Sequence, residues 1–300
     1  MATQTASFGA SKRESHDATR FYERRLQVVQ ETGVFKDVTE SPVRDMLFAQ
    51  SAEAMHQLPD NSVALMVTSP PYHVGKDYDS DHSFDEYLAL LQRVFQETWR
   101  VLEPGGRAVV NVANLGRRPY VPLSHLVTGI MLELDFFMRG EIIWQKAKGA
   151  GGNCAWGSWR SASNPVIRDI HEYCLCFSKG RFKRVRKGES TVQSEDFLRD
   201  TLSIWELPSE YASRVNHPAP FPVELPRRFI ELYTFKGDLV LDPFIGSGST
   251  AVAAVKTGRH YVGYDIHQPY VETANERIAA TRAELAGQAT SKRRASSRRG

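Results

Sequence analysis

The sequence has little of several features that would decide its class at once. It contains 3 cysteines in 300 residues, too few for a disulfide framework. No apolar run approaches the roughly 20 residues that cross a bilayer, and the polar segment 1–17 lacks the apolar core of a secretory signal. The net charge is only +3, and the hydrophobic content of 41% is that of an ordinary soluble chain. These absences predict a reduced, cytoplasmic protein.

The cysteines also argue against a metal centre. Cys174 and Cys176 alternate along a predicted strand and therefore share one face of it. A pair placed in this way favours packing in the reduced state over metal binding, so we expect no metal.

What the sequence does contain is a regular alternation of strand-like and helix-like segments, which is typical of an α/β fold with a doubly wound, mostly parallel sheet. The predicted strands cover 46–48, 63–67, 108–112, 141–144, 171–177, 238–242 and 260–264. The predicted helices cover 18–31, 52–58, 84–102, 123–134, 222–234, 250–257 and 269–286. We expect one domain over 18–286, between a disordered N-terminus, 1–17, and a basic disordered tail, 287–300.

Two short stretches carry the chemistry, and each begins where a predicted strand ends. Thr68 to Tyr72 reads Thr-Ser-Pro-Pro-Tyr and follows the apolar run 63–67. Asp242 to Thr250 reads Asp-Pro-Phe-Ile-Gly-Ser-Gly-Ser-Thr and follows an apolar run as well. Open α/β sheets bind their ligands outside the carboxyl ends of the strands. We therefore expect both stretches to line one site.

The second stretch is a glycine-rich turn of the kind that lets a ligand approach the backbone, because glycine has no Cβ. Gly246-Ser247-Gly248 alone is a weak signal, and the chain lacks the G-x-G-x-x-G spacing of a dinucleotide site. Asp265 stands at the end of the next predicted strand. A carboxylate there can accept hydrogen bonds from both hydroxyls of a ribose, and the alternative is an ordinary N-cap of the following helix.

Together the two stretches resemble the catalytic and cofactor motifs of the amino-group DNA methyltransferases, with the catalytic motif first, as in the circularly permuted class β. The resemblance implies a Rossmann-like, S-adenosylmethionine-dependent methyltransferase fold, in the α/β class, with a mixed, mostly parallel, seven-stranded sheet. The implied catalytic half is 46–177 and the implied cofactor half is 217–286.

The resemblance also implies which residues surround S-adenosyl-L-methionine. Those of the glycine-rich stretch are Asp242, Pro243, Phe244, Gly246, Ser247, Gly248 and Thr250. Asp265 for the ribose, Gln50 and the pair His217-Pro218 complete the set. Gln50 departs from the family pattern, because many relatives have Gly-Asp where this chain has Ala49-Gln50. An amide at that position can still hydrogen-bond adenine.

The first stretch suits transfer of a methyl group to an exocyclic amine of a base. Such an amine is a poor nucleophile, because its lone pair is delocalised into the ring, and a site helps by accepting hydrogen bonds from both N–H groups. Ser69 Oγ and the Pro70 carbonyl are the predicted acceptors, and Pro71 fixes the loop. Tyr72 offers an aromatic face to a base flipped out of the duplex.

The residue that precedes Pro-Pro-Tyr indicates which base is methylated, and in this chain it is Ser69. In the family, Thr-Ser-Pro-Pro-Tyr usually accompanies cytosine N4 and Asp-Pro-Pro-Tyr adenine N6. The resemblance thus favours cytosine N4, with adenine N6 as the alternative. Methylation of cytosine C5 is excluded, since it needs a cysteine nucleophile, typically after proline, and the chain has no Pro-Cys. A DNA-binding protein without turnover, and RNA or protein as the substrate, remain as alternatives.

The charge distribution favours double-stranded DNA as the partner. Residues 179–187 and the tail are rich in Lys and Arg, and basic clusters suit a polyanion. We expect the target-recognition region in 147–168 and 178–216. The candidate DNA contacts are Lys76, Trp156, Trp159, Arg160, Arg168, Arg181, Lys183 and Arg184. The resemblance is compatible with a homodimer, with a cognate restriction endonuclease and with a prokaryotic, nucleoid-associated location.

Overall fold

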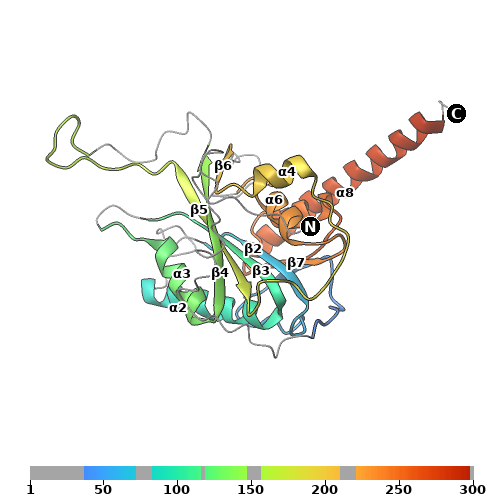
Figure 1. The fold of residues 1–300 in the computed structure, drawn as a ribbon, viewed down its shortest axis with the longest axis horizontal. Helices are drawn as coiled ribbons and strands as arrows, with labels where there is room; N and C mark the ends of the chain where they lie inside the picture. Colours follow the sequence, from blue (N-terminus) through green and yellow to red (C-terminus); the bar gives the residue numbers. More distant parts are fainter. Residues whose placement is uncertain (1–36, 72–82, 116–118, 147–156, 210–220, 298–300) are drawn as a thin grey trace, which may run out of the picture. The chain divides into compact units, whose positions relative to one another are not determined.

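A computed structural model describes residues 37–71, 83–115, 119–146, 157–209 and 221–297 of the chain. They form an eight-stranded sheet with the strand order β1-β8-β7-β2-β3-β5-β4-β6 (Figure 1). The strands are β1 Met46–Ala49, β2 Val63–Thr68, β3 Leu102–Val112, β4 Phe136–Lys146, β5 His171–Lys179, β6 Ile204–Leu207, β7 Leu239–Asp242 and β8 His260–Asp265. The predictions for 1–17 and 18–31 lie outside the described residues.

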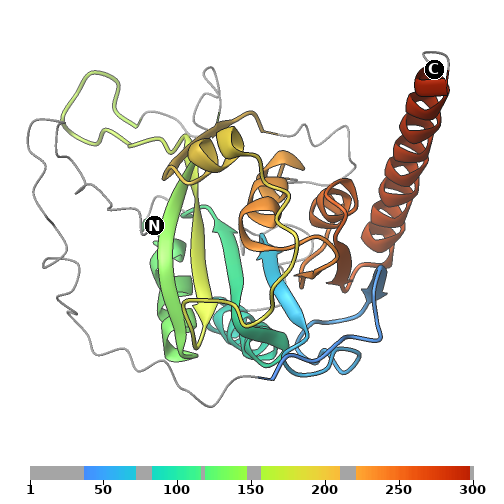
Figure 2. The same ribbon diagram turned by 45° about the vertical axis from the view of Figure 1, so that its right-hand side comes forward.

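Helices cover both faces of the sheet, as expected for a doubly wound fold (Figure 1, Figure 2). They are α2 Phe84–Val101, α3 Leu123–Glu133, α4 Ser194–Asp200, α6 Glu224–Tyr233, α7 Ser249–Lys256 and α8 Gln268–Ser297. Apolar side chains of α2 and α3 pack on one face, and those of α6, α7 and α8 pack on the other. Every residue of β2 is buried between these two layers, which explains the uninterrupted apolar run 63–67.

The direction of the strands brings the predicted site to one edge of the sheet. β1, β8, β7, β2 and β3 are parallel, so their carboxyl ends share an edge, which we call the carboxyl edge. β1 returns beside β8, with Ala49 and Asp265 paired in register, so the strand before the catalytic stretch closes against the last strand of the cofactor half. β5 is antiparallel to both of its neighbours. It therefore begins at the carboxyl edge and ends at the opposite, amino edge.

The sheet has eight strands rather than the predicted seven. The additional strand is β6, which pairs in parallel with β4. It has four residues and alternates between exposed and buried side chains. Trp205 anchors it, since its ring is 1% exposed and lies 4.6 Å from the ring of Phe229. A strand this short inside a polar segment has no clear signal in the sequence.

Residues 52–58, predicted as a helix, form turns instead. Two side chains of α2 explain this, because they satisfy the backbone of Met55 in place of helical neighbours. Glu97 Oε2 accepts from Met55 N at 2.8 Å, and Arg100 donates to Met55 O at 3.0 Å. The burial of Met55 in the core favours this arrangement.

The C-terminal prediction is also corrected. α8 continues to Ser297 rather than ending near 286, so most of the predicted disordered tail is helical. Six of the 11 residues of this extension, 287–297, are Ala, Gln, Lys or Arg, and all of these are good helix formers. No helix of the described residues is both long enough and apolar enough to cross a membrane.

The predicted packing of Cys174 and Cys176 is confirmed, because both lie buried on one face of β5, and both thiols are free. Burial raises the pKa of Cys176 to about 12. This thiol therefore stays protonated and packs as a small apolar group.

Candidate active site

One buried carboxylate joins the two predicted stretches. Asp242, at the end of β7, is 1% exposed. Its Oδ1 accepts from Thr68 Oγ1 at 2.6 Å and from the backbone N–H of Phe244 at 3.1 Å, and its Oδ2 accepts from Thr250 Oγ1 at 2.7 Å. Thr68 immediately precedes Ser69, so Asp242 fixes the catalytic stretch against the glycine-rich stretch. The structure thus places the two stretches side by side.

The geometry of Asp242 predicts a pH dependence of stability. Burial raises the pKa of its carboxyl to about 6, even though three hydrogen bonds favour the ionised form. The raised pKa means that the folded state holds this proton more tightly than the unfolded state. The contribution of Asp242 to stability therefore falls as the pH rises from about 4 to about 6, by about 3 kcal/mol in total.

We expect Asp242→Asn to remove this loss, because an amide of the same shape carries no charge. Thermal unfolding of wild type and variant between pH 4.5 and pH 7 should show a smaller decline of Tm in Asp242→Asn. Asp85→Asn, which changes an exposed carboxylate on α2, is the control and should keep the wild-type slope. Equal slopes for wild type and Asp242→Asn would contradict the prediction.

The glycine-rich turn has the backbone shape of a ligand cradle. Gly246 and Gly248 have φ of 47° and 84°, in the left-handed region that favours glycine. Gly246 N donates to Asp265 Oδ2 at 3.0 Å, and His267 N donates to Oδ1 at 2.9 Å. Each carboxylate oxygen of Asp265 keeps a lone pair for a further donor, which is what two ribose hydroxyls need. The turn and Asp265 therefore fit the nucleoside of S-adenosylmethionine.

Other predicted cofactor residues have positions that support the turn. Pro243, Ser247 and Thr250 are buried, and Ser247 Oγ accepts from Arg277 at 2.8 Å. The half-buried ring of Phe244 packs against the core.

Gln50, the predicted adenine contact, follows β1 at the carboxyl edge. Its side-chain amide pairs reciprocally with that of Gln57, at 3.3 and 3.2 Å. Because Ala49 pairs with Asp265, Gln50 lies next to the strand end that carries the proposed ribose carboxylate. His217 and Pro218 lie outside the described residues.

The catalytic stretch leaves β2 at the carboxyl edge. Ser69 and Pro71 are half-buried and Pro70 is buried. Ser69 Oγ lies 3.5 Å from the side-chain nitrogen of Asn111, a residue near the end of β3. Asn111 could not be singled out from the sequence, because an asparagine inside an apolar strand is no motif by itself. Tyr72 and Lys76 lie outside the described residues.

A loop between β4 and β5 also lies at the carboxyl edge (Figure 1). Gly157 and Pro165 form a bridge, and Ser158 N donates to Asn164 O at 2.9 Å, so the loop is closed on itself. Trp159 is 66% exposed, although tryptophan is a residue that proteins tend to bury. The predicted DNA contacts Arg160 and Arg168 are exposed too, and Trp156 lies outside the described residues.

The basic run 179–187 lies elsewhere. It follows β5, so it lies at the amino edge of the sheet. The nine residues of β5 separate it from the carboxyl edge by about 30 Å. Arg181 and Lys183 therefore do not lie beside Ser69, and any DNA that they contact lies about 30 Å from the predicted position of the target base.

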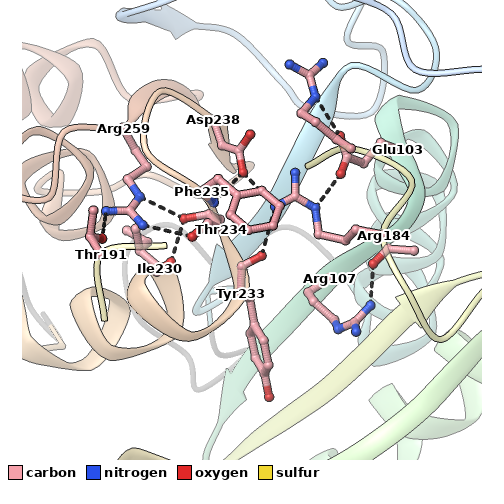
Figure 3. Close-up of polar contacts among 12 residues, drawn as sticks. Glu103, Arg107, Arg184, Thr191, Ile230, Tyr233, Thr234, Phe235, Asp238 and Arg259 are labelled. Atoms are coloured by element: carbon pink, nitrogen blue, oxygen red, sulfur yellow. Dashed lines mark hydrogen bonds and ion pairs between the residues drawn. The ribbon is translucent and has the colours of Figure 1, made fainter. Parts of the chain in front are cut away.

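The prediction that Arg184 contacts DNA is wrong. Its guanidinium lies between two carboxylates (Figure 3), with Nε 2.5 Å from Glu103 Oε1 and Nη1 2.6 Å from Asp238 Oδ2. The side chain of Arg184 is 9% exposed, and those of Glu103 and Asp238 are 1% and 4% exposed. Arg184 thus neutralises buried charge and is not available to a phosphate.

Comparisons with known proteins agree with this site. The N6/N4 DNA methylase family matches residues 63–276. The type II methyltransferase M.MthZI of Methanothermobacter thermautotrophicus is 30% identical, over 78% of this chain and 76% of its own length. The chain therefore belongs to the DNA methylase family.

Solved structures share the fold. TTHA0409 of Thermus thermophilus, a proposed DNA modification methylase solved with S-adenosyl-L-methionine, is 32% identical with a TM-score of 0.64. That match covers 78% of this chain and 93% of the Thermus chain. PvuII DNA methyltransferase, which is cytosine-N4-specific, has a TM-score of 0.64 over 81% of this chain and 90% of its own, at 20% identity. At that identity the likeness concerns the fold alone.

Proposed function

We propose that this DNA methylase, an S-adenosylmethionine-dependent enzyme, methylates the N4 amine of cytosine in double-stranded DNA and belongs to the permuted β class. One observation carries the proposal: the Ser-Pro-Pro segment lies beside the glycine-rich turn, joined by the hydrogen bond from Thr68 to Asp242. The neutral hydroxyl of Ser69, where other family members carry an aspartate, favours cytosine. The catalytic segment precedes the cofactor turn in the chain, which is the permuted order.

Residues of the chain prepare the amine to act as the nucleophile. Bound S-adenosylmethionine supplies an electrophilic methyl group. Ser69 Oγ and the Pro70 carbonyl accept the two N–H groups, which draws the nitrogen out of conjugation with the ring. The bond between Thr68 and Asp242 holds these acceptors in a fixed position relative to the turn at Gly246. Alignment of this kind can supply a large part of a rate enhancement.

Nucleoside mass spectrometry tests the proposal directly. Unmethylated DNA of varied sequence is incubated with the protein and S-adenosylmethionine carrying a labelled methyl group, then digested. We expect label in N4-methylcytosine. Label in N6-methyladenine would keep the fold and the transfer but reject the assignment of the base. A folded protein that labels neither base, but binds DNA, would be the DNA-binding alternative.

Asp265 provides a test of the cofactor site. We expect Asp265→Ala to weaken the binding of S-adenosylhomocysteine about tenfold to a hundredfold, because two hydrogen bonds to a charged acceptor are lost. DNA binding should change less than twofold. Calorimetric titration with S-adenosylhomocysteine and a fluorescence titration with DNA measure the two constants. An equal loss of both would reject the ribose role of Asp265.

Variants in the loop 157–170 and in the basic run should have different effects on the affinity for DNA. We expect Trp159→Ala and Arg168→Ala to weaken DNA binding several-fold, because stacking contributes roughly 1–3 kcal/mol per base and each phosphate contact adds to affinity. Lys183→Ala, an exposed residue at the amino edge, is the matched control and should leave it unchanged. Fluorescence anisotropy at several salt concentrations makes the comparison. A larger effect of Lys183→Ala would place the DNA at the amino edge.

A further inference from the structure

A row of polar side chains crosses four neighbouring strands at the carboxyl edge and begins at Ser69. The strand order here is β2-β3-β5-β4. Ser69 follows β2, Asn111 lies in β3, Glu172 in β5 and Lys146 at the end of β4. Asn111 Nδ2 lies 3.5 Å from Ser69 Oγ and 2.7 Å from Glu172 Oε2, and Lys146 Nζ lies 2.7 Å from Glu172 Oε1. Each member thus contacts the next one along the sheet.

The chemistry of its neighbours fixes the orientation of the Asn111 amide. An ionised carboxylate only accepts hydrogen bonds, so the NH2 group must face Glu172. On its other side, the Asn111 carbonyl oxygen accepts from the Cys174 thiol at 3.3 Å. Asn111 is 2% exposed, and this leaves little water to compete for either group. The second hydrogen of the NH2 group is thereby presented to Ser69.

This arrangement bears on where the proton of the methylated amine goes. Methyl transfer forms an N–C bond with the lone pair of the exocyclic nitrogen, while the S–C bond breaks and its electrons stay on sulfur. The methylated nitrogen then releases one proton. A relay through Ser69 would need a group behind it that takes up a proton, but an amide donor cannot. The carboxylate of Glu172 lies one residue further on, and Lys146 compensates its charge.

We infer that Asn111, oriented by Glu172, is a positioning residue that holds Ser69 as a hydrogen-bond acceptor, and that the proton of the amine leaves to water without a relay through Ser69. The inference rests on the role of Ser69 in the proposed function. It assigns separate tasks to two buried neighbours. The donor group of Asn111 is needed for the rate, whereas the negative charge of Glu172 is not, because a neutral acceptor also orients the amide.

Two variants of nearly unchanged shape separate these tasks. Asn111→Leu removes the donor, and we expect kcat to fall about tenfold or more, the effect of losing one good hydrogen bond. Glu172→Gln removes the charge and keeps one acceptor oxygen, which can face Asn111, while Lys146, with a side chain 29% exposed, can turn to water. We expect kcat within threefold of wild type with an unchanged pH profile. Dissociation constants for DNA and S-adenosylhomocysteine should stay within twofold in both. Single-turnover transfer of labelled methyl groups gives the rates.

Several results would overturn the inference. A wild-type rate in Asn111→Leu would show that Ser69 needs no such support. A fall in Glu172→Gln as large as that in Asn111→Leu, or the loss of an ionisation from its pH profile, would establish a proton relay instead. If Asn111→Leu does not fold, Asn111→Ala, which leaves room for water, is judged by the same rate and binding criteria.

Ser69→Ala separates this inference from the proposed function. A wild-type rate in Ser69→Ala would reject the catalytic role of Ser69, and with it the reason to position that residue. Loss of activity in Ser69→Ala with full activity in Asn111→Leu would reject the positioning role alone. If Asn111 acts through Ser69, the additional change to Leu should lower the residual rate of Ser69→Ala by less than twofold.

Discussion

Ser69→Ala is expected to lower kcat for DNA methylation by at least about a hundredfold, the range found when one preorganised hydrogen-bonding group is removed from an active site. The variant keeps the Pro70 carbonyl, so only one of the two N–H groups of the amine finds an acceptor. The nitrogen then stays closer to the plane of the base and remains a poor nucleophile. Single-turnover transfer of labelled methyl groups to DNA measures this effect without interference from product release.

The effect of Ser69→Ala should be confined to the rate of the chemical step. Ser69 is half-buried at the end of β2, and its replacement leaves the bonds from Thr68 and Thr250 to Asp242 intact. Tm and the binding of S-adenosylhomocysteine should therefore match those of the wild type. A variant that loses affinity for the cofactor in proportion to its rate would indicate that Ser69 supports the turn rather than the amine.

The position of the site could be predicted because it depends on local signals and one topological rule. The stretches at Thr68 and Asp242 each follow a buried strand, and parallel strands bring their carboxyl ends together. The bond between these two residues could not be predicted, since they are 174 positions apart. Asn111 and Glu172 become relevant only when the order of the strands is known, because the antiparallel strand β5 places Glu172 beside β3.

The basic run shows why charge in a sequence does not reveal its partner. Lys179 is 3% exposed, and its amine donates to Asn61 Oδ1 and to the carbonyl of Leu102, each at 2.7 Å. Burial lowers the pKa of this amine to about 8. The acceptors of Lys179 lie in distant segments, so the sequence of 179–187 alone predicts a surface cluster of cations. Exposed cations such as Lys183 and buried ones such as Lys179 alternate within it.

Arg184→Ala is expected to destabilise the protein by about 3–5 kcal/mol, the usual effect of breaking a buried ion pair from one side. The change leaves Glu103 and Asp238, both almost fully buried, without the guanidinium that lies between them (Figure 3). Burial already raises the pKa of Glu103 in the wild type, and the loss of Arg184 raises it further. Urea unfolding at pH 7 measures the free energy of unfolding.

Two comparisons decide whether the cause is unpaired buried charge. Lys183→Ala changes the neighbouring exposed cation and should alter the free energy of unfolding by no more than about 0.5 kcal/mol. Arg184→Met combined with Glu103→Gln and Asp238→Asn removes all three charges, and should recover much of the stability because no charge is left unpaired. A stable Arg184→Ala protein with weakened DNA binding would instead show that Arg184 lies at the surface. The basic run would then contact DNA, and the target duplex would have to reach the amino edge of the sheet.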